Sequence, residues 1–351
     1  MSQPTFETTR LTLRPMRPDD RDAVIKIFAD PVSSKYLTRD MSDPVNAATS
    51  FERWLGWGSP NGMGTWLLDL NGLVIGVGRF TPSDRLPGKV IEVGWFIARP
   101  YAGQGYATEA LRTLLDYGIR VLGLPAIWAL IHAHNEPSVR LAKSLGFLDI
   151  ADHYQPAGPA RIHVLLPSAQ FPRATADGSH GRQPTLRSER LVIRPLREDD
   201  RRDVRDIFGD PEVARFLQVA DQPPTWIDEM IDRRLAFAGP AGMGHWAFVE
   251  DDILVGIGHL RPSSELVGGV VEIGWFLGRE HQGRGLATEA ATAIRDHGLH
   301  TLRLPAVWAL VHKDNQASIK LADRLGFLDV GTGVHYGGPH QVCVALPRTR
   351  V

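Results

Sequence analysis

The chain has 351 residues, of which 43 % are hydrophobic and 23 % charged, and its formal net charge is −1. This composition is typical of a globular protein, and near-neutrality gives no general attraction to nucleic acid or to anionic membranes. The N-terminus has no apolar signal core, and no apolar run approaches the ~18 residues that a membrane span needs. The single cysteine, Cys343, excludes an internal disulfide framework, so we expect a cytoplasmic protein.

Hydrophobic periodicity and turn residues predict the elements of the first half in chain order. A strand at 10–14 ends at Pro15, and Asp19-Asp20 begins a helix that stops near residue 28. The Asn71-Gly72 pair, a strong hairpin signal, joins two strands. The other predicted elements are a helix at 47–55, strands at 66–70, 73–80 and 90–98, a helix at 105–119, a strand at 126–131, a helix at 137–145, and strands near 147–150 and 162–166. Mostly antiparallel strands with one strand–helix–strand crossover predict an α+β domain.

The second half of the chain repeats the first at an offset of 180 positions, without a gap from residue 10 to 167. Repeat units of solenoids have about 20–50 residues and stack in threes or more, so two whole domains are the better interpretation. The segment 168–187 is rich in Gly, Pro, Ser and Thr, which predicts an exposed linker. We therefore predict domains at 1–167 and 188–351, a pseudo-dimer within one chain that is itself a monomer or a homodimer.

A glycine loop stands between a predicted strand and a predicted helix in both halves, Gly103-Gln104-Gly105 and Gly283-Arg284-Gly285. The free N–H groups and the dipole at a helix start favour an anion, and glycine lets the backbone approach a ligand closely. A dinucleotide fingerprint needs a third glycine where Thr108 and Thr288 stand, and a P-loop needs Gly-Lys-Ser/Thr. The loops therefore predict pyrophosphate sites of another kind, with a glycine turn that binds nothing as the alternative.

The pattern Gln/Arg-x-x-Gly-x-Gly/Ala, placed after a strand and opening a helix, resembles the acetyl-CoA motif of the GNAT superfamily of N-acetyltransferases. The second half carries this pattern in full from Gln282 to Ala287, whereas Ala102 replaces the leading residue in the first half. The segments that begin at Asn135 and Asn315 and end in Leu-Gly-Phe resemble a later helix of the family. The resemblance covers nearly all of both halves.

This resemblance implies two tandem GNAT domains, each a mixed, mostly antiparallel sheet with splayed central parallel strands flanked by helices. The openings Arg10-Leu11 and Arg190-Leu191 look like the subgroup that acetylates ribosomal proteins and other N-terminal amines. The implied enzyme moves an acetyl group from acetyl-CoA, as cosubstrate, to the primary amine of a small molecule or of a peptide N-terminus.

The resemblance also implies where acetyl-CoA binds. Pantetheine would lie between the splayed strands, with backbone N–H groups facing the thioester carbonyl as an oxyanion hole, and the glycine loops would hold the pyrophosphate. The implied acetyl-CoA residues of the first half are Trp95, Phe96, Ile97, Gly103, Gln104, Gly105, Tyr106, Ala107 and Asn135. Those of the second half are Trp275, Phe276, Leu277, Gln282, Gly283, Arg284, Gly285, Leu286, Ala287 and Asn315.

Glu92 and Glu272 are the first candidates for the general base, because each lies on an otherwise apolar strand. Partial burial would raise the pKa of such a carboxylate and suit it to accept a proton from an ammonium through water. The position also matches a strand glutamate that several members of the family use as base. The alternative is a structural or solvated carboxylate on the outer face of the sheet.

Several options stay open for the general acid. Many relatives use a tyrosine at the position of Ala142 and Ala322, so Ser138 and Ser318 are candidate proton donors near the sulfur. A serine there is equally expected as a helix cap, and water or a solvated thiolate is a third option.

His132 and His312 follow a buried strand and are interpreted as structural, and Cys343 as a buried strand thiol whose repeat partner is His163. No His, Cys, Asp or Glu cluster has metal-ligand spacing, so no metal is predicted.

Three functions therefore stay open: a tandem acetyltransferase with two active halves, an asymmetric pair in which only the second half catalyses, and a non-catalytic acyl-CoA-binding regulator. We expect the acceptor amine to contact the first two helices and the loop at 83–89 or 263–269. These helices differ between the halves, so the identity of the amine stays open. No nucleic acid and no membrane are expected as partners.

Overall fold

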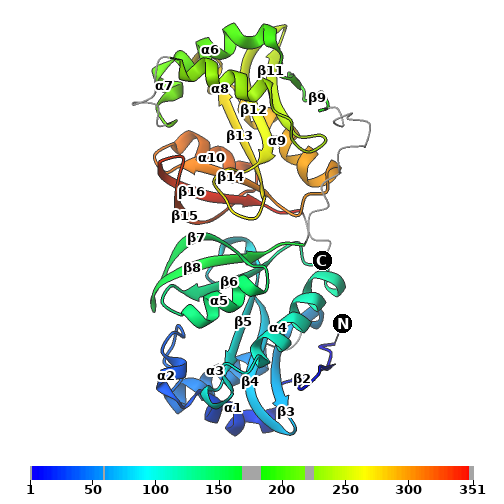
Figure 1. Cartoon of the computed structure of the whole chain (residues 1–351), viewed down its shortest axis with the longest axis vertical. Helices are drawn as coiled ribbons and strands as arrows, with labels where there is room; N and C mark the ends of the chain where they lie inside the picture. Colours follow the sequence, from blue (N-terminus) through cyan, green and yellow to red (C-terminus); the bar gives the residue numbers. More distant parts are fainter. Residues whose placement is uncertain (1, 58–59, 168–182, 218–224, 348–351) are drawn as a thin grey trace. The chain divides into compact units, whose positions relative to one another are not determined.

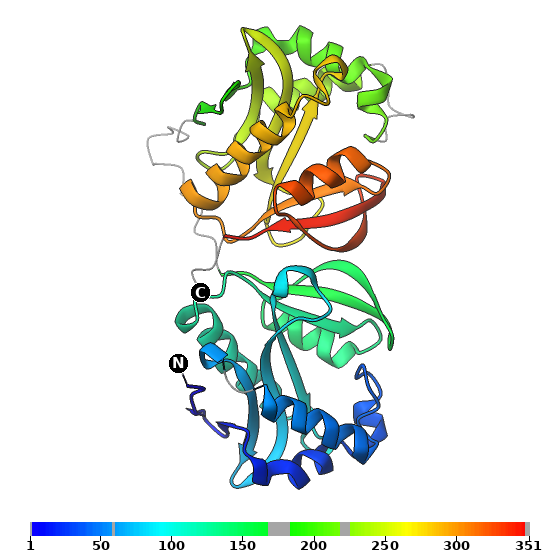
Figure 2. The ribbon, with the colours of Figure 1, turned by 180° about the vertical axis from the view of Figure 1, so that it is seen from behind.

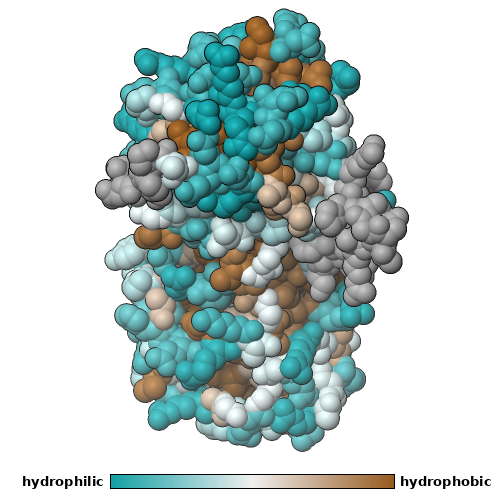
Figure 3. Space-filling view, turned by 45° about the horizontal axis from the view of Figure 1, so that its top comes forward, coloured by the Kyte–Doolittle hydropathy of each residue, from teal (hydrophilic) through white to brown (hydrophobic). Residues whose placement is uncertain are grey.

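The computed structural model describes residues 2–57, 60–167, 183–217 and 225–347. These residues form two compact units (Figure 1), which we call unit 1 (2–167) and unit 2 (183–347). None of the helices in the described ranges is long and apolar enough to cross a membrane. Hydrophilic residues cover most of the face drawn in Figure 3, with apolar residues gathered in smaller patches.

Apart from the short elements Phe6–Glu7 and Pro31–Ser34, the strands and helices of unit 1 follow the predicted order. Its strands are β1 (Phe6–Glu7), β2 (Thr12–Pro15), β3 (Gly64–Leu70), β4 (Leu73–Pro82), β5 (Ile91–Ile97), β6 (Ile127–His132), β7 (Leu148–Gln155) and β8 (Gly158–Leu165). Its helices are α1 (Arg21–Phe28), α2 (Pro31–Ser34), α3 (Pro44–Gly56), α4 (Tyr106–Asp116) and α5 (Glu136–Ser144).

Unit 2 has the same order of elements. Its strands are β9 (Leu186–Arg187), β10 (Val192–Pro195), β11 (Gly244–Glu250), β12 (Ile253–Pro262), β13 (Val271–Leu277), β14 (Val307–His312), β15 (Leu328–His335) and β16 (Gly338–Ala345). Its helices are α6 (Arg201–Gly209), α7 (Pro211–Ala214), α8 (Trp226–Leu235), α9 (Leu286–Asp296) and α10 (Gln316–Arg324).

Each unit is built on one mixed sheet with helices on both faces. The strand order is β1-β2-β3-β4-β5-β6-β8-β7 in unit 1 and β9-β10-β11-β12-β13-β14-β16-β15 in unit 2. Only β5 with β6 and β13 with β14 are parallel among the pairs described, and the helix between them makes the crossover. In unit 2, α6 and α8 pack on one face and α9 and α10 on the other (Figures 1 and 2). The predicted α+β architecture is confirmed.

The two cores are centred on tryptophans. Trp66 and Trp128 in unit 1, and Trp246 and Trp308 in unit 2, are fully buried. Each indole body supplies a large apolar area, so these residues dominate the burial energy of the sheet centre. The Trp246 indole N–H also donates to the carbonyl of Pro184 at 2.8 Å.

Some elements differ from the sequence prediction. Helix α4 ends at Asp116 and continues as a π-helical turn, η5 (Tyr117–Val121), and the last two strands are longer than expected because they form a hairpin, β7–β8. Of the predicted linker, residues 168–182 lie outside the described residues, whereas Leu186–Arg187 form β9. The end of that segment is structured because Pro184 and Leu186 are held against the core of unit 2.

The tight hairpin turns have the backbone conformation that their residues favour. Asn71 and Gly72 have φ angles of 52° and 87°, and their counterparts Asp251 and Asp252 have 48° and 65°. Two positive φ angles in a two-residue connection define a type I′ turn, which matches the twist of the strands that it joins. The hairpin predicted from Asn-Gly is confirmed.

Cys343 is buried on β16, with 4 % of its surface exposed. Burial raises the pKa of its thiol to about 12, so almost no reactive thiolate exists at neutral pH. We expect a thiol reagent to label no cysteine in the native protein and one per chain after denaturation. Rapid labelling of the native protein would contradict the interpretation of Cys343 as a buried strand thiol.

Candidate active site

The central parallel strands separate after one register pair in each unit. Strand β13 pairs with β14 only at Glu272 and Trp308, and β5 pairs with β6 only at Glu92 and Trp128. The following residues of the two strands are unpaired with each other, so those backbone N–H and C=O groups that point into the gap between them are available to a ligand. This is the splay expected from the sequence.

In unit 2 the separated strands border a cavity of about 870 Å³. A volume of this size suits a small-molecule ligand. Helix α8, strand β12 and the β15–β16 hairpin complete its wall. The cavity brings together five of the residues predicted from the sequence, which are Glu272, Trp275, Phe276, Asn315 and Ser318.

The glycine loops have the same backbone in both units. Gly103 and Gly283 both have φ of 75°, and Gly105 and Gly285, the N-caps of α4 and α9, both have φ of 84°. This left-handed conformation favours glycine, and it leaves the N–H groups of the first helical turn unpaired. A Cβ at Gly103 or Gly283 would meet no atom within 4 Å, so the space above the loop is open. An open loop with free N–H groups at a helix start suits an anion.

An ion pair fixes each loop to the start of its unit. In unit 2, Arg190 Nε donates to Glu289 Oε1 at 2.6 Å, and Arg190 Nη2 donates to the carbonyl of Arg284 at 2.9 Å. In unit 1, Arg10 makes the equivalent bonds to Glu109 and to the carbonyl of Gln104. The two glutamates in the first helical turn therefore position the loop, in addition to any interaction with the helix dipole.

The remaining loop residues are placed as follows. Gln282 Nε2 donates to the carbonyl of Leu277 at 3.2 Å, linking the loop to the end of β13. Ala102, its counterpart, has no side chain that can make this bond. The other predicted loop residues lie at the helix start or at the strand end: Gln104, Tyr106 and Ala107 with Ile97 in unit 1, and Arg284, Leu286 and Ala287 in unit 2.

Asn135 and Asn315 cap the helices that follow β6 and β14. Their side-chain oxygens accept hydrogen bonds from the backbone N–H groups of Ser138 and Ser318, at 3.4 and 3.1 Å. In unit 2 the Ser318 hydroxyl also accepts a hydrogen bond from Trp275 Nε1 at 3.3 Å. Ser318 lines the cavity, so its hydroxyl can contact a ligand. The position of its backbone N–H is explained by the helix cap alone.

Glu272 is 4 % exposed and lies in a polar cluster. Its carboxylate accepts hydrogen bonds from the Ser263 hydroxyl at 2.6 Å and from the Tyr336 hydroxyl at 2.7 Å. Arg261 Nη2 and His259 Nε2 lie 3.8 and 3.7 Å from the carboxylate, beyond hydrogen-bond distance.

The electrostatics of Glu272 differ from the expectation of a raised pKa. Burial opposes ionisation, but His259, the Ser263 hydroxyl and Arg261 outweigh it and lower the pKa of Glu272 to about 2. The prediction of a raised pKa was wrong. It considered only the desolvation of the carboxylate, and not the polar partners that other segments of the chain place beside it. Glu272 is therefore ionised at every working pH.

Glu92 has a different neighbour. It forms a direct ion pair with Arg85 Nη2 and accepts a hydrogen bond from the Ser83 hydroxyl at 2.9 Å. Arg85 also donates to Gln155 at 2.7 Å, which fixes the guanidinium in place. The position of Arg85 is occupied by Glu265 in unit 2, so the charge beside the strand glutamate is reversed.

Comparison with known proteins identifies the family. The family model described as an acetyltransferase (GNAT) domain matches residues 10–148 and again residues 190–328. The chain belongs to the GNAT acetyltransferase family.

Three proteins illustrate what this GNAT chain is similar to. An uncharacterized N-acetyltransferase p20 of Bacillus licheniformis is 32 % identical over 146 residues, which cover 41 % of this chain and 82 % of the relative. Spermidine N(1)-acetyltransferase of Escherichia coli (strain K12) is 29 % identical over 154 residues, covering 41 % and 76 %. A solved acetyltransferase from Agrobacterium tumefaciens str. C58 is 27 % identical with a TM-score of 0.40, covering 48 % and 96 %. The protein is an acetyl-CoA-dependent N-acetyltransferase.

The structure of this GNAT protein also reveals site residues that the sequence analysis missed. Tyr336, His259, Arg261 and Arg234 all line the cavity of unit 2. A signal for them exists in the repeat, because these are positions at which the halves differ: their counterparts are Pro156, Arg79, Thr81 and Trp54. Motifs shared by the two halves cannot reveal these residues, because each of them is present in one half only.

The histidines near the site do not form a metal centre within the described ranges, where no group of three or more His, Cys, Asp or Glu could hold an ion. His312 lines the cavity with its ring 5.4 Å from that of His340. His132, in unit 1, lies 4.9 Å from the ring of Tyr36. These aromatic contacts are compatible with the structural role expected of both.

Proposed function

We propose that unit 2 catalyses acetyl transfer to a primary amine and that Glu272 accepts the proton that the amine loses. The observation that carries this proposal is the cavity of unit 2, which borders the separated strands and is lined by Glu272, Trp275 and Ser318. Acetyl-CoA supplies a thioester, and the loop at Gly283 and Gly285 would hold its pyrophosphate.

The atoms balance with the groups at hand. The amine nitrogen forms a bond to the acetyl carbon, the carbon–sulfur bond breaks, and the sulfur leaves with its electron pair. The nitrogen loses a proton, and the Glu272 carboxylate receives it directly or through water. A nitrogen that has just formed a bond is far more acidic than a free ammonium, so a carboxylate of low pKa suffices. Backbone N–H groups near Trp275 and Phe276 would stabilise the oxyanion, and the Ser318 hydroxyl or water would return a proton to the sulfur.

We infer that unit 1 binds acetyl-CoA without catalysing. Its glycine loop has the same φ angles as that of unit 2, which supports binding. Its strand glutamate, Glu92, is neutralised by the direct ion pair with Arg85, which supports the absence of catalysis. Catalysis by both units is the competing arrangement, and variants of Glu92 and Glu272 separate the two.

The remaining assignments of the sequence analysis are kept as proposals. We propose a first domain at 1–167 and a second that includes β9 and so begins before residue 188. We also propose a cytoplasmic location, which the buried, unpaired thiol of Cys343 supports. The acceptor is proposed to be a small amine or a peptide N-terminus, because a relative acts on spermidine by its name.

The direct test is release of free CoA thiol from acetyl-CoA, measured with a panel of small amines and N-terminal peptides. We expect at least one amine to stimulate thiol release and to appear as its acetylated product. Hydrolysis at the rate of the amine-free control, with every amine of the panel, would contradict acetylation of such an amine by unit 2.

A pH profile tests the state of Glu272. Since its pKa is about 2, the carboxylate stays ionised as pH falls to about 4, and it should produce no acid limb. We expect kcat/KM to rise with pH through the pKa of the acceptor amine itself, because only the neutral amine attacks. Two acceptors with different amine pKa values should give two different midpoints between about pH 5 and 9. A midpoint that stays the same for both acceptors would assign the titration to a group of the enzyme.

A further inference from the structure

A guanidinium without a charged partner lies in the cavity of unit 2. Arg234, near the end of α8, lines the cavity together with Glu272. Its Cζ lies 4.9 Å from the centre of the Phe208 ring and 5.4 Å from the centre of the Phe276 ring. Its Nη1 is buried and has no hydrogen-bond partner among the described residues.

This arrangement leaves the Arg234 guanidinium incompletely satisfied. Aromatic rings interact with the faces of a guanidinium, whereas its N–H groups point outward along the edge and need acceptors. Burial, together with the charge of Arg261, lowers the pKa of Arg234 to about 9. The side chain is still protonated at neutral pH, and a buried cation without an acceptor is unfavourable for the folded state.

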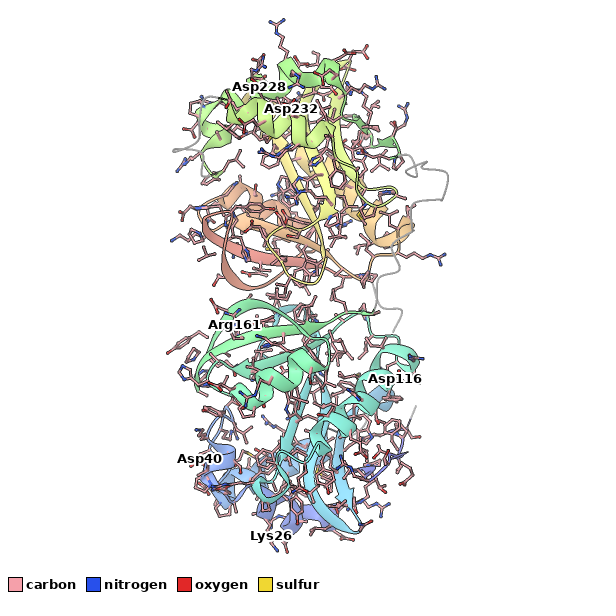
Figure 4. All side chains as sticks on the ribbon, viewed as in Figure 1. Lys26, Asp40, Asp116, Arg161, Asp228 and Asp232 are labelled. Atoms are coloured by element: carbon pink, nitrogen blue, oxygen red, sulfur yellow. The ribbon has the colours of Figure 1, made fainter. Side chains whose placement is uncertain are left out.

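Other charged residues of the same helix are paired. Asp228 and Asp232, labelled in Figure 4, form ion pairs with Arg205 and Arg201 of α6. The cavity carboxylate Glu272 is engaged by Ser263 and Tyr336. The acceptor that Arg234 lacks is therefore missing from its surroundings in the described part of unit 2.

In unit 1 the equivalent contact contains one cation, Arg79, and a side chain of unit 1 accepts a hydrogen bond from it. The pair at positions 54 and 79 is Trp and Arg, whereas the pair at 234 and 259 is Arg and His. Arg79 lies over the Trp54 ring at 5.2 Å and donates to the Thr81 hydroxyl at 3.1 Å.

Unit 2 has a second cation, Arg261, where unit 1 has Thr81. Its neighbour His259 is neutral at pH 7, because burial lowers the pKa of that imidazole to about 4. Three guanidinium groups, Arg233, Arg234 and Arg261, therefore line the cavity of unit 2 with two carboxylates, Glu229 and Glu272. Glu229 faces Arg233 at 4.0 Å and Glu272 is engaged by Ser263 and Tyr336, so one positive charge is left over.

We propose that the cavity of unit 2 takes an acceptor that carries a carboxylate as well as the amine, with the carboxylate on Arg234 and the amine toward Glu272. The inference rests on the proposed function. A guanidinium binds a carboxylate through parallel hydrogen bonds, which supplies both charge and orientation. A polyamine would instead bring a second ammonium toward Arg234 and Arg261, and like charges in a cavity are rejected. Amino acids and similar amino carboxylates are the chemical class that fits.

The test compares matched acceptors on the full chain. Each amino acid of a panel is paired with its own carboxamide, which has the same amine and side chain but no carboxylate, and spermidine is included as a polyamine. We expect kcat/KM for the best amino acid to exceed that of its amide by about 10- to 100-fold, the range of a hydrogen bond to a charged group. The amide has the less basic amine and so more neutral amine at a given pH, which works against the expected result.

Three variants assign the preference to Arg234. Arg234→Gln should abolish the discrimination between acid and amide, Arg234→Lys should retain part of it, and neither should change the Kd of acetyl-CoA. Arg205→Gln removes an exposed, paired cation that faces the same helix, and it should leave the discrimination unchanged. Equal use of acid and amide, or preference for spermidine, by the unaltered chain would overturn the acceptor class and leave acetyl transfer standing. If no amine of the panel raised thiol release above the amine-free control, the proposed function itself would be contradicted.

Two readouts do not depend on turnover. Calorimetry should show that the N-acetylated amino acid binds at least tenfold more tightly than the N-acetylated carboxamide of the same amino acid. Equal binding of the two, or no detectable binding of either, would overturn the proposal. In the absence of ligand, Arg234→Met should unfold at the same or a higher temperature than the unaltered chain, because it removes an unpaired buried charge. A clear fall in the unfolding temperature would mean that Arg234 is structural.

Discussion

Replacement of Glu272 by Gln is expected to lower kcat for acetyl transfer by about 10²- to 10⁴-fold, the usual contribution of a general base. The amide has nearly the shape of the carboxylate, but it cannot take the proton from the amine nitrogen. Its single oxygen, placed where Oε2 lies, can still accept the hydrogen bonds that Ser263 and Tyr336 donate to that position, at 2.6 and 3.0 Å. The KM for acetyl-CoA should change little, because Glu272 lies at the start of the strand splay and apart from the glycine loop.

Glu92→Gln is the matched control, since it makes the same substitution at the same position of the other unit. We expect it to leave kcat within about twofold, because Arg85 already neutralises Glu92. Equal losses from the two single variants would show that both units catalyse. Activity that survives in the Glu92→Gln, Glu272→Gln double variant would reject the strand glutamates as bases. Initial rates of thiol release, with the acetylated product quantified, give these values.

Local patterns in the sequence were sufficient to predict most of the fold. The Asn71-Gly72 turn, the apolar strands and the helix that begins after Gly105 are encoded within a few neighbouring residues, and each is found in the structure. The repeat then supported each predicted element a second time, because an element predicted in one half is expected 180 positions away in the other. Short elements such as β1 and α2 were missed, since two to four residues carry too little periodicity.

The candidate site was predictable only where its residues are consecutive or lie on one element. The glycine loop and Glu272 are of this kind. The partners of Glu272 come from β12, from the loop after it and from the β15–β16 turn, up to 64 positions away. The direction of its pKa shift depends on those partners, so no local pattern predicts it.

The β15–β16 turn shows how a local difference reaches the site. Tyr336 has φ of 48° and Gly337 has φ of 80°, so they form a type I′ turn that sets the Tyr336 hydroxyl on Glu272. Proline cannot adopt a positive φ, so Pro156 excludes this turn from unit 1. Two sheets of one topology therefore present different side chains to the strand glutamate.

The other large effect is expected at the glycine loop. Gly283 and Gly285 have φ of 75° and 84°, and each L-residue held in this left-handed region costs about 1–2 kcal/mol. The double variant Gly283→Ala, Gly285→Ala should relax the loop in the absence of ligand, so that acetyl-CoA must restore the strained form on binding. We expect its Kd at unit 2 to rise by about 100-fold. Calorimetric titration should show two acetyl-CoA sites in the unaltered chain and one remaining tight site in this variant.

The chain offers two controls for this experiment. Gly103→Ala, Gly105→Ala alters the same angles in unit 1, so it should remove the other site and leave turnover intact. Gly209→Ala changes a glycine of unit 2 that has no positive φ and no atom within 4 Å of the added Cβ, and it should bind as the unaltered chain does. A stoichiometry of one in the unaltered chain would reject binding by both units. If turnover fell with the unit 1 pair instead, catalysis would belong to unit 1, and the ion pair of Glu92 with Arg85 would have to open during the reaction.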